Sequence, residues 1–212
     1  MTRRTATTIT VATLAVFAVL GLTACDPGMP KPTGSSTPSS TAASTLTASA
    51  TDRPKPPQAD APKDRDAAVA AANKTYVAYL EAQIPFKKDI SLGAQYLSGY
   101  VLQGSPAWTV LTDTAEKSPT SPIKDGAFGW TLNGAMSYAS SSTNGANGQK
   151  IENGAVHLFG CRDNTNVTFA NTDVPKGSFP VGAVLVFVPD AHAWMVQEDK
   201  SLTASDGEIP QC

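Results

Sequence analysis

The sequence predicts one α+β domain, in which helices at its start pack on one face of a curved antiparallel sheet. Two observations support this fold class. Between residues 64 and 116, apolar side chains recur every three or four positions, which is the period of a helix. Beyond Gly126 the period changes, and short runs of β-branched and aromatic residues alternate with turn residues. Because the preceding residues show neither pattern, the folded domain is expected over residues 64–212.

The first predicted helix covers residues 64–83, and the prolines at positions 62 and 85 are expected to bound it. Its apolar face consists of side chains spaced three or four apart: Val69, Ala72, Tyr76 and Leu80. Two weaker helices are predicted at residues 92–102 and 106–116, where apolar residues recur at similar spacing.

The predicted sheet begins after these helices. Residues 128–140 are expected to form a bulged strand, and residues 140–150, rich in Ser, Thr, Asn and Gly, form a turn. Four further strands are predicted at residues 155–159, 166–170, 183–188 and 193–197, each bounded by turn residues. Residues 189–192 are typical of a tight hairpin connection. The strands are therefore expected to form an antiparallel meander.

The N-terminus has the pattern of an export signal. Arg3 and Arg4 supply positive charge, and an uncharged, largely apolar run follows over residues 9–22. This run is shorter than the roughly 20 residues that a membrane-spanning helix needs. Small residues then precede Cys25, as they do at a cleavage site.

The four residues Leu22-Thr23-Ala24-Cys25 resemble the lipobox of bacterial lipoproteins. The resemblance implies that residues 1–24 are removed and that diacylglycerol is attached to the sulfur of Cys25. Two or three acyl chains hold a protein stably on a membrane, since each buried methylene contributes roughly 0.8 kcal/mol. The expected location is therefore the extracytoplasmic face of the cell membrane. The alternatives are an ordinary secreted protein with a chance cysteine, or export by a twin-arginine route through Arg3 and Arg4.

Residues 25–63 are expected to be a disordered tether that carries the lipidated cysteine at its start. The segment is rich in Ser, Thr, Pro and Ala, and almost none of it can be buried to offset the entropy of ordering. Its expected role is to give the domain reach above the membrane. A specific recognition segment is the alternative.

The two remaining cysteines, Cys161 and Cys212, form an even pair in an exported chain. Such a pair indicates one disulfide, which closes a loop of about fifty residues and stabilises the fold by roughly 4 kcal/mol. The alternative is two free thiols, which the oxidising conditions outside the cytoplasm disfavour.

The order of a helix, short helices and then several strands is similar to the nuclear transport factor 2-like fold, a cone-shaped α+β roll. Actinobacterial lipoproteins of this type share finer features. Their Cys-x-Asp pattern is matched by Cys161-Arg162-Asp163, their Trp-x-Val strand by Trp194-Met195-Val196, and their terminal cysteine by Cys212. The resemblance covers residues 64–212. The chain departs from the pattern of these lipoproteins in the turn before Gly154 and in the stretch of residues 172–180, which contains two prolines.

The sequence holds few catalytic signals. It contains no Gly-x-Ser-x-Gly, no His-Glu-x-x-His and no phosphate-binding glycine loop, and its two histidines suggest no zinc site. The net charge of −2 and the lack of a basic stripe argue against nucleic acid as a partner. No cofactor or metal is therefore predicted.

His157 is a weak catalytic candidate. It alternates with Val156 and Leu158 and so shares a sheet face with Phe159. In the resembled fold one sheet face lines a cavity, and SnoaL-like cyclases use a cavity His and Asp there. The alternative is an ordinary strand histidine. His192 is expected to be solvated in the hairpin, and Asp163 to form a turn through its side chain.

Several aromatic residues are expected either to line a ligand cavity or to fill the core of the domain. These are Tyr76, Tyr96, Trp108, Trp130, Phe159 and Trp194.

The leading functional hypothesis is a membrane-anchored, non-catalytic domain that binds an envelope protein or a small apolar ligand. The lipid anchor, the tether and the missing catalytic motifs favour it. The alternatives are an enzyme or lipid carrier that uses the cone cavity, and a structural envelope protein.

Overall fold

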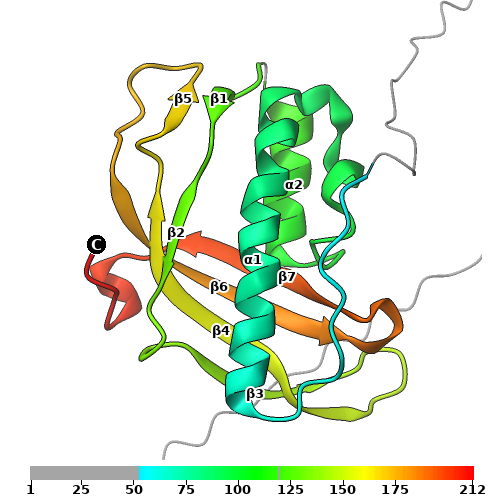
Figure 1. The fold of residues 1–212 in the computed structure, drawn as a ribbon. Coiled ribbons are helices and arrows are strands. Elements are labelled where there is room, and N and C mark those ends of the chain that lie inside the picture. The colour runs from blue at the N-terminus through cyan, green and yellow to red at the C-terminus, as the bar shows by residue number, and fades with distance from the viewer. Residues whose placement is uncertain (1–52, 119) are drawn as a thin grey trace, which may run out of the picture. The chain divides into compact units, whose positions relative to one another are not determined.

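The computed structural model describes residues 53–118 and 120–212. The predicted signal peptide, Cys25 and most of the predicted tether lie outside the described residues. The described chain is α+β, as the sequence predicts: helices pack on a curved antiparallel sheet (Figure 1).

Helix α1 (Arg65–Lys88) crosses the sheet (Figure 1). Asp64 caps its N-terminus, because its carboxylate accepts a hydrogen bond of 2.8 Å from the backbone N–H of Ala67. The predicted end near residue 83 was wrong, because the helix continues through Pro85 to Lys88. An interior proline removes a backbone hydrogen bond. The extension nevertheless buries Phe86, which is 1 % exposed, in the core.

The predicted helix at residues 92–102 was also wrong. Two short 3-10 helices stand there instead, η2 (Ile90–Leu92) and η3 (Ala94–Leu97). Gly93 separates them with φ of +69°, a left-handed conformation that a helix does not contain. Helix α2 (Pro106–Lys117) agrees with the prediction, and Ser105 caps it by accepting from the backbone N–H of Trp108 at 3.2 Å.

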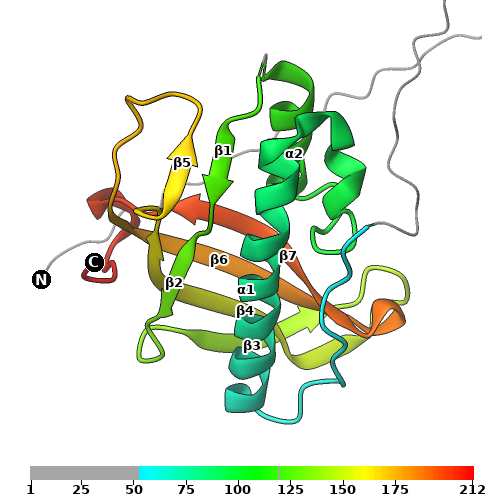
Figure 2. The ribbon, with the colours of Figure 1, turned by 45° about the horizontal axis from the view of Figure 1, so that its top comes forward.

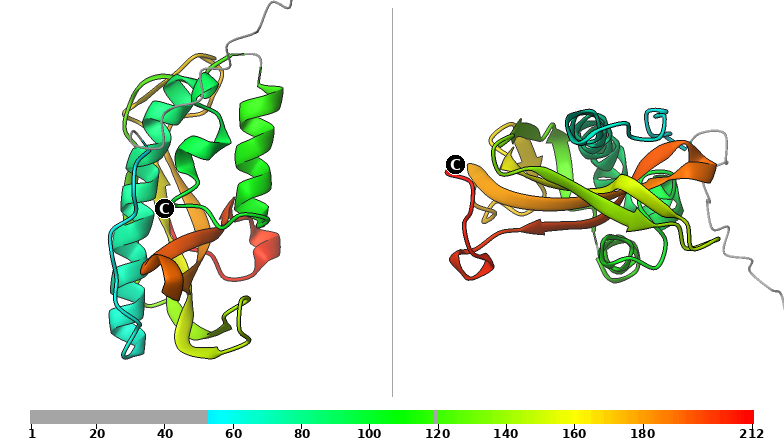
Figure 3. Two further views of the ribbon diagram at one scale, coloured as in Figure 1. Left: turned by 90° about the vertical axis from the view of Figure 1, so that its right-hand side faces the viewer. Right: turned by 90° about the horizontal axis from the view of Figure 1, so that it is seen from below.

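The main sheet has the strand order β2-β4-β6-β7, and β3 also pairs with β4. The strands are β2 (Gly129–Leu132), β3 (Tyr138–Thr143), β4 (Lys150–Asp163), β6 (Ser178–Val188) and β7 (Ala193–Ser201). All pairings are antiparallel. The strands are twisted and curved (Figure 3). The hairpin predicted between the last two strands is confirmed and contains η4 (Pro189–Ala191).

The single strand predicted at residues 128–140 is in fact two strands. Both β2 and β3 pair with the same edge of β4, and a turn at residues 133–137 separates them. The turn is closed by a backbone hydrogen bond of 3.1 Å from Ser137 to Asn133. Because both strands run antiparallel to β4, they continue in the same direction, and the polar residues between them form an excursion from the ladder that is longer than the expected bulge.

A second departure from the predicted meander is a separate two-stranded ribbon. Strand β5 (Val167–Phe169), which was expected in the main sheet, pairs instead with β1 (Ile123–Gly126). The sequence did not predict β1, because Ile-Lys-Asp-Gly shows no alternation of apolar residues over a useful length. The ribbon lies beside the C-terminal half of α1 (Figures 1 and 2).

The core lies between the sheet and the helices. Val156 and Leu158 of β4 face it together with Leu185 of β6 and Val196 of β7, and all four are fully buried. Gly160 continues this face of β4, and a Cβ there would lie 2.6 Å from the ring of Trp130. The missing side chain therefore allows the indole to pack closely across the sheet.

The last part of the predicted tether is ordered. Residues 53–63 run in extended form along the domain (Figure 1). The Tyr100 hydroxyl donates to the carbonyl of Lys55 at 2.8 Å, and the backbone N–H of Ala59 donates to the carbonyl of His192 at 2.8 Å. The boundary predicted at residue 63 therefore lies too late, because this stretch has hydrogen-bond partners on the fold.

The predicted disulfide between Cys161 and Cys212 is present, with a sequence separation of 51 residues. Cys161 faces away from α1, since it alternates with Gly160 on β4. The bridge thus attaches the C-terminal tail to the outer face of the sheet, meaning the face opposite α1. Leu202 of that tail covers Gly182 and is 7 % exposed.

We expect the double variant Cys161→Ser/Cys212→Ser to lose about 4 kcal/mol of unfolding free energy, because the open chain gains entropy when unfolded. Urea denaturation followed by circular dichroism measures the difference. Reduction of the unaltered protein is the control and should produce the same decrease. An unchanged midpoint after reduction would show that the bridge adds no stability.

Candidate functional site

A β-bulge between β6 and β7 creates the charged centre of the domain. Val196 pairs with Leu185, but Glu198 pairs with Val184, so β7 contains one extra residue at this point. An extra residue reverses the alternation of the faces. As a result Asp199 faces the helices, and Glu198 faces outward.

The bulge brings Asp199 opposite Arg162 of β4. Nη1 of Arg162 lies 3.0 Å from Oδ2 and 3.3 Å from Oδ1 of Asp199. The two side chains are 22 % and 11 % exposed, so the ion pair is largely removed from water. The Tyr76 hydroxyl of α1 donates to Oδ1 of Asp199 at 3.0 Å. One carboxylate therefore joins β4, β7 and α1.

The protonation states around this pair are well defined. Burial raises the pKa of Tyr76 well above its ordinary value, and the charge of Asp199 raises it further. Burial and the charge of Asp199 also raise the pKa of Tyr79, so both phenols stay neutral. Burial lowers the pKa of Arg162, but Asp199 outweighs this effect and the net shift is upward. The centre thus holds one carboxylate and one permanent cation.

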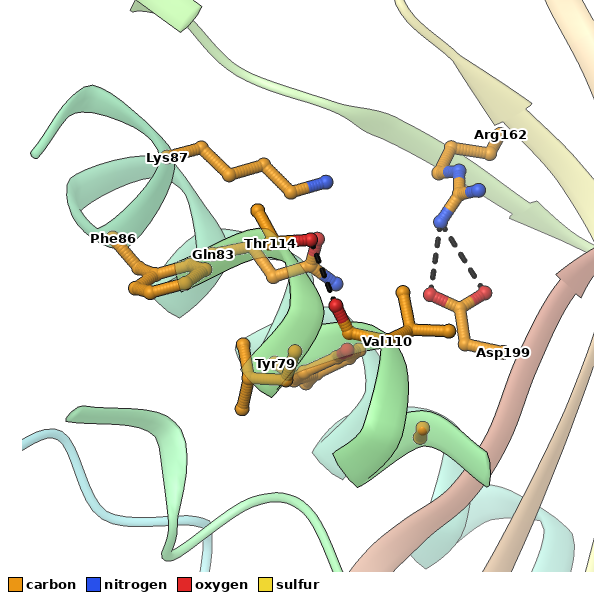
Figure 4. A pocket seen from close by; sticks show the side chains of 10 residues that line it. Tyr79, Gln83, Phe86, Lys87, Val110, Thr114, Arg162 and Asp199 are labelled. Atoms are coloured by element: carbon orange, nitrogen blue, oxygen red, sulfur yellow. Dashed lines mark hydrogen bonds and ion pairs between the residues drawn. The ribbon is translucent and has the colours of Figure 1, made fainter. Parts of the chain in front are cut away.

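A cavity of about 140 Å³ lies between α1, α2 and the sheet beside this ion pair, and we call it the helix cavity (Figure 4). Val110, at 63 % exposed, lies at its edge and indicates that it opens to solvent. Its apolar walls include Phe86, Ala107 and Leu111.

A second cavity of about 320 Å³, the strand cavity, lies between the end of α1, the β1–β5 ribbon and β6. Its walls are mainly apolar and include Phe128, Phe169, Val174, Pro175 and Phe179. Lys87 and Arg162 line both cavities, so the two spaces adjoin at these cations. Together they reach the size of small-molecule sites, roughly 300–1,000 Å³.

Lys87 lies on the last turn of α1 and is half-buried. Its Nζ lies 5.2 Å above the centre of the Phe128 ring, and the guanidinium of Arg162 lies 5.9 Å from the same ring. Burial lowers the pKa of Lys87 to about 8, and the positive charge of Arg162 lowers it as well. Within residues 53–118 and 120–212 the ammonium has no hydrogen-bond or ion-pair partner.

Gln83 supplies a third polar group. The residue is 4 % exposed, and its amide nitrogen is buried without an acceptor in the described part of the chain. A buried donor without an acceptor is uncommon in folded proteins. Figure 4 shows the ends of Gln83, Lys87 and Arg162 directed toward the same space.

His157, the weak catalytic candidate, does not belong to this site. It lies on the outer face of β4, opposite Val184 and therefore beside Glu198. Its ring stacks on Tyr138 with centroids 4.6 Å apart. Burial lowers its pKa, which Glu198 partly offsets. The other two polar predictions agree with the structure: His192 is exposed, and Asp163 accepts from the backbone N–H of Thr165 at 2.8 Å.

Of the six aromatic residues expected to line a cavity or to fill the core, five lie in the core or pack against it, Tyr96 among them. Tyr76 and Trp194 are fully buried in the core. Trp130 packs edge-on against Tyr76, with centroids 4.7 Å apart, and donates from its indole nitrogen to Asn73 at 2.8 Å. Trp108 packs on the core, and Phe159 lines a depression of about 210 Å³ on the outer face. None of the six lines the helix cavity or the strand cavity.

Sequence reasoning missed the residues that do form the site. One signal was present: Gln83 and Lys87 continue the spacing of Tyr76 and Leu80, so polar groups extend the apolar face of α1. Arg162 carried no such signal, because its orientation depends on the register of β4. Asp199 carried none because its orientation depends on the bulge.

The residues that the structure describes lack two features. No helix among them has the length and apolarity needed to span a bilayer. They also hold no cluster of three or more His, Cys, Asp or Glu side chains suited to a metal ion. Comparison of the chain with protein-family models, curated proteins and solved structures finds no match.

We expect Asp199→Ala to destabilise the fold by about 3 kcal/mol, because Arg162 then stays buried without its counterion. Urea denaturation gives the value. The matched control is Glu152→Ala, which breaks the exposed ion pair with Lys150 and should change stability far less, because solvent screens that pair.

The double variant Arg162→Met/Asp199→Leu separates the charge effect from a packing defect. Replacement of both charges by apolar groups should recover part of the lost stability, since the Tyr76 hydroxyl still loses its acceptor. If the double variant is as unstable as Asp199→Ala, the uncompensated charge of Arg162 is not the cause of the lost stability.

Proposed function

We propose that this chain is a membrane-anchored extracytoplasmic lipoprotein whose folded domain binds a small, largely apolar ligand without chemical conversion. The observation that carries the proposal is the pair of adjoining cavities, walled by apolar side chains and joined by a few polar groups. Small-molecule sites have this composition. Large exposed apolar patches mark many protein-binding surfaces, and among the described residues only Val110 and Tyr138 are large exposed apolar side chains.

The polar groups of the site favour binding over catalysis. Both oxygens of the Asp199 carboxylate accept hydrogen bonds, from Arg162 and, at Oδ1, also from Tyr76. Both buried tyrosines remain protonated. His157 faces the opposite side of the sheet. A general acid–base mechanism uses groups that exchange protons near neutral pH, and among the described residues that line the two cavities Lys87, whose pKa is lowered to about 8, stands without a second such group beside it.

The nuclear transport factor 2-like roll is the fold to which we assign the domain. Support comes from the helices packed on a curved antiparallel sheet and from cavities on the helical side. The lipobox resemblance of residues 22–25 supports the anchor, and the Ser/Thr/Pro-rich stretch that follows supports a spacer.

Ligand binding is tested by filling the helix cavity. We expect Ala107→Phe to weaken binding of a neutral apolar probe, radiolabelled octanamide, by roughly tenfold or more, because the ring occupies the space between α1 and α2. Equilibrium dialysis of the full chain in phosphatidylcholine nanodiscs measures the affinity, with empty nanodiscs as the blank.

Two further variants make this result decisive. Thr109→Phe adds the same ring to the exposed side of α2 and should leave binding unchanged. Thr114→Phe adds the ring at a half-buried position that lines the cavity. This variant replaces Ala107→Phe if that variant does not fold, and it should weaken octanamide binding in the same way. If all folded variants bind octanamide like the unaltered chain, the helix cavity is not the site.

The anchor is tested at Cys25. We expect the unaltered protein to fractionate with membranes and to carry the mass of diacylglycerol on its first residue, Cys25. The variant Cys25→Ser should lose both properties, because serine has no thiol to accept the lipid. Intact-mass spectrometry and membrane fractionation give the readouts, and an unaltered protein that lacks the added mass of diacylglycerol would exclude the lipid anchor.

A further inference from the structure

The junction of the two cavities presents hydrogen-bond donors without matching acceptors. The ammonium of Lys87 has no partner in the described chain, and the buried amide nitrogen of Gln83 has none. Arg162 uses Nη1 for Asp199, which leaves Nε and Nη2 available. Three side chains from α1 and β4 therefore offer protons to the same space.

The charges at this junction do not balance. Lys87 and Arg162 each carry one positive charge, and Asp199 carries the one negative charge that faces them from β7. Lys88, the next residue on α1, is already paired with Asp125 at 3.0 Å and lines neither cavity. One unit of positive charge thus remains in a space with apolar walls, where a charge without a counterion is unfavourable.

We infer that the ligand is an apolar carboxylic acid whose carboxylate lies at Lys87, Arg162 and Gln83 and whose apolar body occupies the adjoining cavities. A carboxylate is an acceptor only, so it matches a set of donors. Its single negative charge cancels the excess positive charge. Hydrogen bonds between ionised groups are also stronger than neutral ones. This inference rests on the proposed function, because it names the chemical class of the ligand for the same site.

The test compares octanoate with octanamide, which has a similar shape but no charge, under the dialysis conditions given above. We expect octanoate to bind the full chain roughly tenfold or more tightly than octanamide. Lys87→Met should abolish this preference while retaining octanamide binding. The matched control is Lys88→Met, which removes the same charge from the neighbouring residue and should retain the preference.

The pH dependence gives a second readout. The pKa of Lys87 is lowered to about 8, so octanoate affinity should fall as the pH rises from 7 to 9.5 and the ammonium loses its proton. The other groups facing Lys87 do not interfere: Arg162 stays charged, and the pKa values of Tyr76 and Tyr79 are raised. Asp199 stays paired with Arg162. Lys87→Met should bind octanoate equally at both pH values.

Each outcome decides one proposal. Equal binding of octanoate and octanamide would overturn the carboxylate assignment and leave the cavity function standing. Equal affinity of Lys87→Met and the unaltered chain for octanoate would also overturn it. Octyl phosphate binding more than roughly tenfold tighter than octanoate would assign the site to a phosphate. Failure of both neutral and charged probes to bind would instead contradict the proposed function.

Discussion

The ion pair between Arg162 and Asp199 is the interaction on which the interior depends. It connects β4 and β7 across β6, and the Tyr76 hydroxyl extends it to α1. Two opposite charges at low exposure are stable only while both are present, since removal of one leaves the other without compensation. The pair also marks a boundary: the closed apolar core lies on one side, and the helix cavity begins on the other.

The two faces of the sheet carry different groups. The face toward α1 carries the core, the ion pair and the cavities. The outer face carries the tail held by the Cys161–Cys212 bridge, together with the stack of Tyr138 on His157. His157 therefore acts in packing on the outer face, and the polar chemistry of the domain is concentrated at Lys87, Gln83 and Arg162.

The proposals fit together physically. An apolar acid combines a long hydrophobic body with one charge, and such molecules collect at membrane surfaces. The proposed lipid on Cys25 and the proposed spacer would keep the domain near such a surface. The cavity then needs only apolar walls and one unbalanced cation, and the junction at Lys87 provides both.

Local patterns determined much of the fold. The period of the side chains between residues 64 and 116 and the later change to short β-rich runs were sufficient for the α+β class, because burial requires those periods. Capping by Asp64 and Ser105 likewise depends on neighbouring residues alone. The disulfide followed from an even pair of cysteines in a chain whose first residues have the pattern of an export signal.

Only the tertiary structure decided where the site lies. The extra residue of β7 turns Asp199 inward, and nothing in its sequence neighbourhood marks that bulge. The extension of α1 past Pro85 places Lys87 at the cavities, because burial of Phe86 outweighs the local effect of the proline. The choice between cavity lining and core for the aromatic residues was likewise left to the tertiary structure, because whether a Tyr or Trp fills a core or faces a cavity depends on what packs against it from distant parts of the chain.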